Sequence, residues 1–283
     1  MIYIDNSATT KQYPQVTETM MKYMEEYFGN PSSMYQLGLD SEKAVKHARK
    51  QVEEAMGAGN GTLIFTSGGT EADNTAIFGA ARALRRRGNR IITSAVEHPA
   101  VLECCKRLEQ DGYDVVYVGV DDKCRLDLEQ LEDAIDENTI LVSLMQVNNE
   151  AGTIMPVDAV KDLMKNAPGW FHCDAVQSFG KLQVPESADL ISVSSHKIHG
   201  PKGAGALFVR KGIHLPALIE GGGQESGNRS GTENVPAITG FGTAAELSAK
   251  DRDEERQRVS VMRRTLLNGL KDNLEDLRIN SVE

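Results

Sequence analysis

Cysteine is scarce in this chain of 283 residues, which contains four: Cys104, Cys105, Cys124 and Cys173. Their spacing fits neither a disulfide framework nor a zinc site. We therefore expect reduced thiols and a cytoplasmic protein, with the four cysteines serving as inert packing or surface residues.

Long apolar runs are also missing. The longest, such as residues 140–147, are far too short to span a bilayer. The N-terminal residues show no basic region followed by an apolar stretch, so we expect no signal peptide. The sequence predicts no association with a membrane.

Positive charge is in short supply. Lysine and arginine number 31 against 41 aspartates and glutamates, which gives a formal net charge of -10. No basic stripe stands out along the chain. Nucleic acid is therefore not an expected partner.

Short β-branched segments alternate with helical patterns from residue 62 onward. The predicted strands cover residues 63–66, 91–93, 115–120, 140–147, 170–173, 190–194 and 206–209. The predicted helices cover 70–87, a stretch from 99, 128–135, a stretch after 156, and 236–274. Such alternation predicts an α/β fold with a mostly parallel sheet flanked by helices.

Polar clusters follow many of these strands. They cover residues 67–70, 97–98, 148–150, 174–177 and 194–197. Ligands of open α/β sheets bind outside the carboxyl ends of the strands. We therefore expect these clusters to meet in one site.

Two residues suggest chemistry based on pyridoxal phosphate, which needs a lysine for its aldehyde and an acid for its ring nitrogen. Lys197 follows a strand among small and polar residues, and Asp174 ends another. Taken alone, Lys197 would be interpreted as a solvated loop lysine. Asp174 could instead cap a helix, a role that we expect to exclude contact with the ring. Gln177 could reach the phenolic oxygen of the ring, or be an ordinary surface residue.

An anion cradle and a stacking surface are also expected. Gly69 and Thr70 open a helix directly after a strand, where free backbone amides favour a phosphate. Ser194 and His196 flank the lysine closely enough to join them. His98 could lie on the ring face and shuttle protons, or be a buried, hydrogen-bonded histidine.

Competing motifs fail on spacing. Residues 200–203 lack the P-loop pattern, and the glycines at 203–205 lead into a strand rather than a helix. A metal site could be built from His172, Cys173, His196 and His199. Alternation along a strand points the first two to opposite faces, so we expect no metal site.

The motifs resemble those of cysteine desulfurases, in the class V aminotransferase superfamily of fold type I. The resemblance covers nearly the whole chain and rests on residues 3–10, 29–33, 66–71, 97–98, 148–152, 172–177, 195–197, 200–203, 221–225 and 229–232. It implies a seven-stranded, mostly parallel sheet in a cofactor-binding domain at residues 11–260. Residues 1–10 and 261–283 would belong to an incomplete small domain.

The resemblance also implies roles for individual residues. Lys197 would form the Schiff base and remove the Cα proton, and His98 would stack on the ring as the second catalytic residue. Asp174 would pair with the ring nitrogen, and Gln177 would meet the phenolic oxygen. Asn149 would lie beside the ring and the substrate.

The phosphate would be held by several groups: Gly69, Thr70, Ser194 and His196. The resemblance further implies that Thr232 reaches the phosphate of the other subunit. It therefore implies a homodimer with shared sites.

The implied reaction converts L-cysteine to L-alanine and passes the sulfur to a cysteine as a persulfide. In the family, that cysteine lies on a mobile loop beyond position 283, as does an arginine for the substrate carboxylate. None of the four cysteines here is at the matching place. We expect either a truncated desulfurase, a complete chain with slow cofactor chemistry, or a dimerising module or half of a split enzyme.

The motifs leave the substrate and the sulfur acceptor open. A selenocysteine lyase or another class V enzyme would show the same motifs. The sulfur acceptor or scaffold protein could serve iron–sulfur cluster assembly, thiolated RNA or another route.

Overall fold

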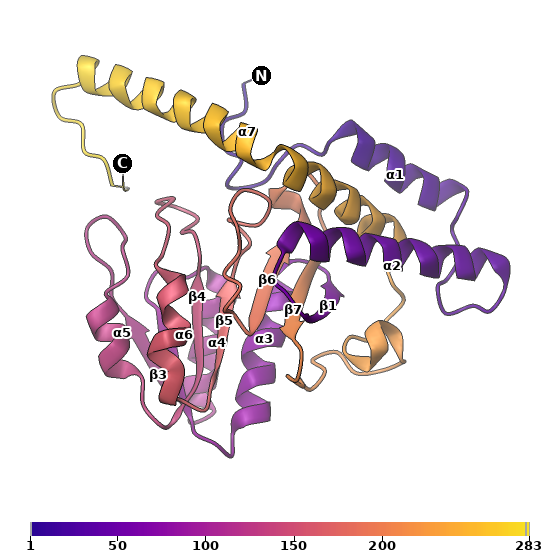
Figure 1. Ribbon diagram of the computed structural model, residues 1–283, viewed down its shortest axis with the longest axis horizontal. Coiled ribbons are helices and arrows are strands. Elements are labelled where there is room, and N and C mark those ends of the chain that lie inside the picture. The colour runs from indigo at the N-terminus through magenta and orange to yellow at the C-terminus, as the bar shows by residue number, and fades with distance from the viewer. Residues whose placement is uncertain (1, 281, 283) are drawn as a thin grey trace.

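The computed structural model describes residues 2–280 and 282, which fold around one seven-stranded sheet (Figure 1). The strands are β1 (Gly61–Thr66), β2 (Arg90–Ser94), β3 (Asp114–Val118), β4 (Thr139–Met145), β5 (Trp170–Asp174), β6 (Leu190–Ser194) and β7 (Gly205–Arg210). Their order is β1-β7-β6-β5-β4-β2-β3; β7 runs antiparallel to both of its neighbours, and the other neighbouring strands of the sheet are parallel. The predicted α/β fold with a mostly parallel sheet is confirmed.

Helices cover both faces of the sheet. They are α1 (Pro14–Glu25), α2 (Gln36–Met56), α3 (Gly69–Leu84), α4 (Pro99–Gln110), α5 (Leu128–Ala134), α6 (Val160–Leu163) and α7 (Val235–Asn273). Buried side chains of α3 and α4 form one core against the sheet. Side chains of α1, α2 and α7 belong to a second, larger core.

The predicted elements differ from the structure mainly at their ends. The strand expected at 115–120 stops at Val118, and that at 140–147 stops at Met145. The helix expected at 70–87 ends at Leu84, whose carbonyl accepts from the Arg87 N–H in a tight turn. After residue 156 the chain forms only short pieces: η1 (Val157–Ala159), α6 and η2 (Met164–Asn166).

Two helices precede the region in which elements were predicted. Helices α1 and α2 form a layer with the first half of α7, and close contacts fix that layer. A Cβ at Gly242 would lie 2.7 Å from the Cα of Ala48 in α2, and one at Gly240 would lie 2.7 Å from Cγ of Met20 in α1. Because a side chain at either position would push the helices apart, glycine sets their spacing.

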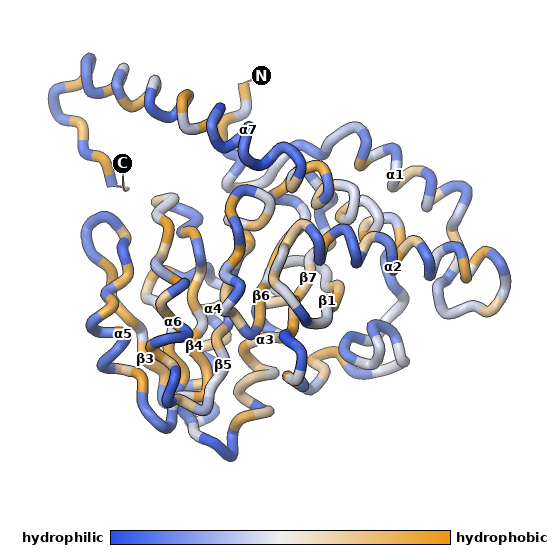
Figure 2. The backbone as a smooth tube through the Cα atoms, viewed as in Figure 1, coloured by the Kyte–Doolittle hydropathy of each residue, from blue (hydrophilic) through white to orange (hydrophobic). Residues whose placement is uncertain are grey.

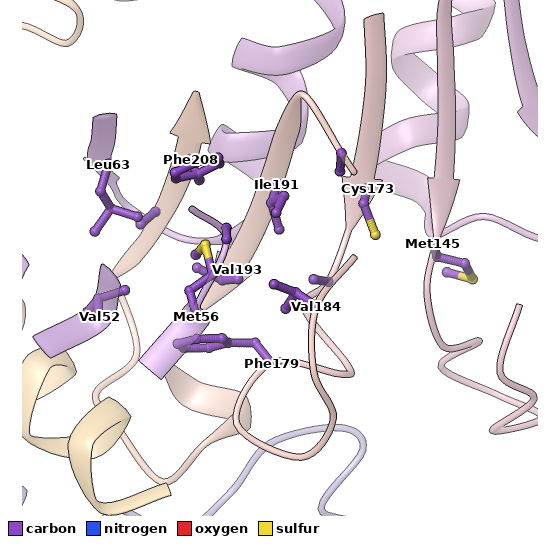
Figure 3. Packing of buried hydrophobic residues seen from close by; sticks show 14 of the residues in the cluster. Val52, Met56, Leu63, Met145, Cys173, Phe179, Val184, Ile191, Val193 and Phe208 are labelled. Atoms are coloured by element: carbon purple, nitrogen blue, oxygen red, sulfur yellow. The ribbon is translucent and has the colours of Figure 1, made fainter. Parts of the chain in front are cut away.

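The larger core lies between this layer and the sheet. Phe241 of α7 is fully buried and meets Phe65 and Phe179 edge to face, with ring centroids 6.3 and 6.2 Å apart. Figure 3 shows Phe179 beside Met56 and Val193 in this core. Such aromatic contacts stabilise the packing beyond the area they bury.

Helix α7 has two different halves. Its first half is buried, whereas Val261, Met262 and Leu266 of its second half are more than half exposed. Figure 2 shows this second half as mostly hydrophilic with isolated apolar residues, reaching away from the sheet. The predicted domain boundary at residue 260 falls inside this helix. Within the described residues, no helix combines the length and apolar character needed to cross a membrane.

Candidate functional site

A cavity of about 500 Å³ lies at the carboxyl ends of the parallel strands. Its lining residues come from the N-terminal segment, α3 and the segments that follow β2, β4, β5 and β6. They are Asp5, Ser7, Ala8, Gly69, Thr70, Asp73, His98, Met145, Val147, Asn149, Glu150, Asp174, Val176, Gln177, Ser194, His196 and Lys197. Every predicted cofactor residue except Thr232 is among them.

Lys197 lies in the 3-10 turn η3 (Ser195–Lys197), directly after β6. Its Nζ donates to the carbonyl oxygens of Ser7 and Ala8, the latter at 2.9 Å. Burial lowers the pKa of this amine, and Asp174 partly opposes the effect. Lys197 is thus held inside the cavity by the chain's N-terminal segment rather than solvated as a loop lysine.

Asp174 ends β5 and is buried. Its Oδ1 accepts from the Val176 N–H at 2.9 Å, within a turn that does not continue into a helix. Burial raises the pKa of this carboxyl, whereas that hydrogen bond and the nearby His98 and Lys197 lower it. Because no helix follows this turn, Asp174 does not cap a helix, and the turn engages only its Oδ1.

His98 is exposed at the N-cap of α4, so its interpretation as a buried histidine was wrong. Its Nδ1 accepts from the Ala100 N–H at 3.1 Å, which assigns the proton of the neutral ring to Nε2. Gln177 Nε2 donates to the Ser7 carbonyl at 3.0 Å. Asn149 Nδ2 donates to Glu150 Oε1 at 2.8 Å.

The N-terminus of α3 opens into the cavity beside Ser194 and His196. Its N-cap, Gly68, has a φ of 157° and no side chain to bond the first amides of the helix. A Cβ at Gly69 would lie 2.7 Å from Cγ2 of Val176, so glycine allows this close approach. Burial and nearby lysines lower the pKa of His196 to about 4, which leaves a neutral ring with one N–H. Together with Thr70, this donor set suits a phosphate.

Thr232 lies outside this cavity and is exposed. It lines a separate cavity of about 180 Å³ together with Ser67, Gly203 and Arg229. Within one chain it therefore does not join the other predicted cofactor residues.

Two parts of the site were missed by sequence reasoning. One is the segment of residues 5–8, which only the tertiary fold brings to the cavity. The other is Asp73, a buried acid on α3. Its signal was available, because Asp73 is four residues after Gly69 and interrupts the apolar face formed by Ala72, Ala76 and Ile77.

The cysteines all lie in the described part of the chain, and none lines the cavity. Cys104, Cys105 and Cys173 are buried, and burial raises the pKa of both thiols on α4 to about 12. Thiols held neutral in this way are poor nucleophiles. Among the described residues, no group of three or more acidic, histidine or cysteine side chains could hold a metal ion.

The cavity meets the requirements of pyridoxal phosphate. It offers an amine of lowered pKa, a buried carboxyl, an imidazole and a helix N-terminus with hydroxyl and imidazole donors. Asp73 Oδ1, buried in its floor, has no hydrogen-bond partner among the described residues. These residues fit the cofactor.

Comparison with known proteins gives a consistent result. Residues 2–283 match the family described as Aminotransferase class-V. The chain is 43% identical over 282 residues to the cysteine desulfurase IscS of Clostridium botulinum, covering 99% of this chain and 71% of that protein. A solved NifS-like protein superposes with a TM-score of 0.91 at 39% identity, covering 96% of this chain and 76% of the other. A structure titled SspA in complex with cysteine gives 0.81 at 37%, covering 87% and 72%.

Proposed function

Because the chain belongs to the class V aminotransferase family and is cysteine desulfurase-like, we propose that its cavity acts on L-cysteine. The family depends on pyridoxal phosphate, which is therefore the cofactor. The solved relative titled as a complex with cysteine supports the choice of substrate. The observation that carries the proposal is the meeting of Lys197, Asp174 and the α3 N-terminus in one cavity.

When bound, pyridoxal phosphate would supply an electron sink for negative charge that develops at the substrate Cα. Asp174 would hold a proton on the ring nitrogen, and Lys197 would hold the cofactor covalently through Nζ. The lowered pKa of Lys197 favours a neutral amine, which can take the Cα proton once the substrate has displaced it.

Other residues would bind and orient. Gly69, Thr70, Ser194 and His196 would hold the phosphate through backbone amides, hydroxyls and the imidazole N–H. His98 would stack on the ring and keep Nε2–H as its remaining donor, because its Nδ1 already accepts from the Ala100 N–H. Gln177 would donate to the phenolic oxygen after releasing the Ser7 carbonyl, and Asn149 would lie beside the ring and the substrate. These two amides would orient the ring and the substrate.

The sulfur acceptor must be a thiolate that reaches the cavity. The four cysteines are outside it, and three are buried. We infer that these residues alone give cofactor binding and at most slow chemistry, and that the accepting thiol comes from another segment or polypeptide. The chain spans 71% of the length of the Clostridium botulinum relative.

The position of Thr232 supports a homodimer with shared sites, because it lines a separate cavity rather than the one that holds the other predicted cofactor residues. Residues 11–260 would form the cofactor-binding domain, and residues 1–10 and 261–283 part of a smaller one. The four free thiols fit a reducing compartment such as the cytoplasm. The sulfur would pass to an acceptor or scaffold protein, for which iron–sulfur cluster assembly is one route. Selenocysteine is the alternative substrate.

The test is covalent mapping of the cofactor. The purified chain is incubated with pyridoxal phosphate, reduced with borohydride and digested, and the labelled peptide is identified by mass spectrometry. The label should lie on Lys197 and disappear in Lys197→Ala, whereas Lys202→Ala, which removes an exposed lysine nearby, should keep it. Labelling at another lysine, or none, would overturn the proposal.

A second assay addresses the thiol. L-cysteine is added to the loaded chain, and alanine and sulfide are measured with and without an added thiol acceptor. Slow alanine formation that the acceptor accelerates would support an external thiol. Rapid turnover by the chain alone, retained when all four cysteines are replaced by alanine, would contradict it.

A further inference from the structure

A hydrogen-bond network of buried polar side chains lies beneath the cavity, and the proposed reaction does not use it. Asp73 comes from α3, Ser143 from β4, His172 from β5 and Ser192 from β6, and none is more than 1% exposed. His172 Nδ1 lies 2.8 Å from Ser143 Oγ, and its Nε2 lies 2.9 Å from Ser192 Oγ. The Nε2 atom is also 3.6 Å from Asp73 Oδ1. Polar groups buried this deeply are costly unless each has a partner.

The hydrogen-bond partners of His172 decide which groups of this network donate and which accept. Burial lowers the pKa of His172 to about 3, so the ring is neutral and carries one N–H. Hydrogen bonding from the Ser192 hydroxyl lowers the pKa of Asp73, against the larger effect of burial. The arrangement is then satisfied when Nε2–H donates to Ser192 and Nδ1 accepts from Ser143. The series of hydrogen-bond donors ends at Asp73, so this acid is the last group of the network.

Asp73 and Asp174 line the same cavity, and because the charge of Asp174 raises the pKa of Asp73, ionisation of one buried carboxyl disfavours ionisation of the other. Burial raises the pKa of Asp73 well above its ordinary value, and the charge of Asp174 adds to this effect. Burial raises the pKa of Asp174 as well, but the Val176 N–H, His98 and Lys197 oppose this effect and favour its ionised form. The unpartnered Oδ1 of Asp73 fits a neutral acid, since an ion there would lack compensation.

We propose that Asp73 is a positioning residue for the cofactor ring. It is a protonated acid that ends the Ser143–His172–Ser192 hydrogen-bond network, and it leaves Asp174 as the ionised carboxylate of the two. The inference rests on the proposed function, because the ring is that of pyridoxal phosphate. Asp73 acts through Asp174. Because Asp73 is neutral, the negative charge stays on Asp174, the carboxylate that would meet the ring nitrogen. The hydrogen-bond network that ends at Asp73 holds the buried side chains beneath the cavity in place.

The matched pair of variants is Asp73→Asn and Asp73→Ala. The amide is neutral and nearly isosteric, so Asp73→Asn should bind pyridoxal phosphate within about threefold of the unmodified chain. Asp73→Ala, which removes the last group of the hydrogen-bond network, should bind pyridoxal phosphate about tenfold more weakly. Nitrogen-15 NMR of ring-labelled pyridoxal phosphate should report a protonated ring nitrogen in Asp73→Asn, and a less protonated one in Asp73→Ala. An Asn variant as weak as the Ala variant would overturn the proposal, because it would mean that a charge is needed.

Infrared spectroscopy tests the protonation of Asp73 without the cofactor. The difference between the unmodified chain and Asp73→Asn at neutral pH should show the carbonyl stretch of a protonated carboxyl. Asp189→Asn is the control, since Asp189 is buried but paired with Lys161 at the opposite end of β6. It should show loss of a carboxylate band instead, with no change in the nitrogen-15 signal. A carboxylate band lost in Asp73→Asn would overturn the inference.

The two proposals fail in different ways. If the unmodified chain binds no pyridoxal phosphate at Lys197, the proposed function fails, while the infrared difference still decides the state of Asp73. If it binds and both Asp73 variants match it in affinity and nitrogen-15 signal, only the inference about Asp73 fails.

Discussion

Replacing Glu97 by glutamine is expected to remove a pH dependence from the stability of the chain. Glu97 is 5% exposed, and its Oε1 accepts from Ser94 Oγ at 2.6 Å and from the Met145 N–H at 3.1 Å. Its Oε2 is buried with no partner among the described residues. Glutamine keeps the shape and one acceptor oxygen but carries no titratable proton.

The size of the effect follows from the shift in pKa. Burial, together with the charge of Asp174, raises the pKa of Glu97 from 4.5 to about 8. The folded state binds the proton of Glu97 more tightly than the unfolded state does, so protonation of Glu97 contributes to the free energy of unfolding. This contribution is fully present below pH 4.5. That contribution is lost as the pH rises through 8. One pKa unit corresponds to about 1.4 kcal/mol, so the loss between pH 5.5 and 8 is about 3 kcal/mol.

The assay is urea unfolding followed by circular dichroism at several pH values from 5.5 to 8. The free energy of unfolding of the unmodified chain should fall by about 3 kcal/mol relative to that of Glu97→Gln over this range. Glu132→Gln, which removes an exposed carboxylate of α5, controls for the change in net charge. Free energies of Glu97→Gln and the unmodified chain that run parallel with pH would refute a raised pKa at this position.

The remaining predictions concern packing, a buried ion pair and the thiols. Phe241→Ala should lower the free energy of unfolding by about 4 kcal/mol in urea titrations, because its ring is fully buried; Phe241→Leu should cost less than half as much. Arg49→Met should cost about 3 kcal/mol, because it strips the guanidinium from a Glu225 carboxylate that is 3% exposed; adding Glu225→Gln should recover part of the loss. Thiol labelling of the folded chain should modify the half-buried Cys124 first and the two buried thiols of α4 only on unfolding; equal rates would contradict their burial.

Much of the site could be predicted from the sequence because a local rule applied. In a parallel sheet the carboxyl ends of strands share one edge, so polar residues after successive strands meet there. Lys197, Asp174, His98 and the α3 N-terminus follow this rule and line one cavity. Asn149, Gln177, Ser194 and His196 join them there. Their chemical roles stay predictions until the cofactor is mapped.

Other features had no local signal. Thr232 shares the motif pattern yet lies in a different cavity, because its position depends on how the loop after β7 folds back. Helices α1 and α2 were missed, since nothing in the strand–helix alternation that begins at residue 62 extends to them. The ends of α3, β3 and β4 also differ by a few residues from their predicted positions, because turns and hydrogen bonds set them.

The sequence by itself determined the fold class, the strands that build the sheet and the polar residues at its carboxyl edge. Periodicity and composition act over a few residues, so they suffice for those features. Only the tertiary structure decided that residues 5–8 close on Lys197, and that Asp73 lies against His172 and lines the same cavity as Asp174. These contacts join groups about a hundred residues or more apart, and their protonation depends on burial that only the packed fold creates.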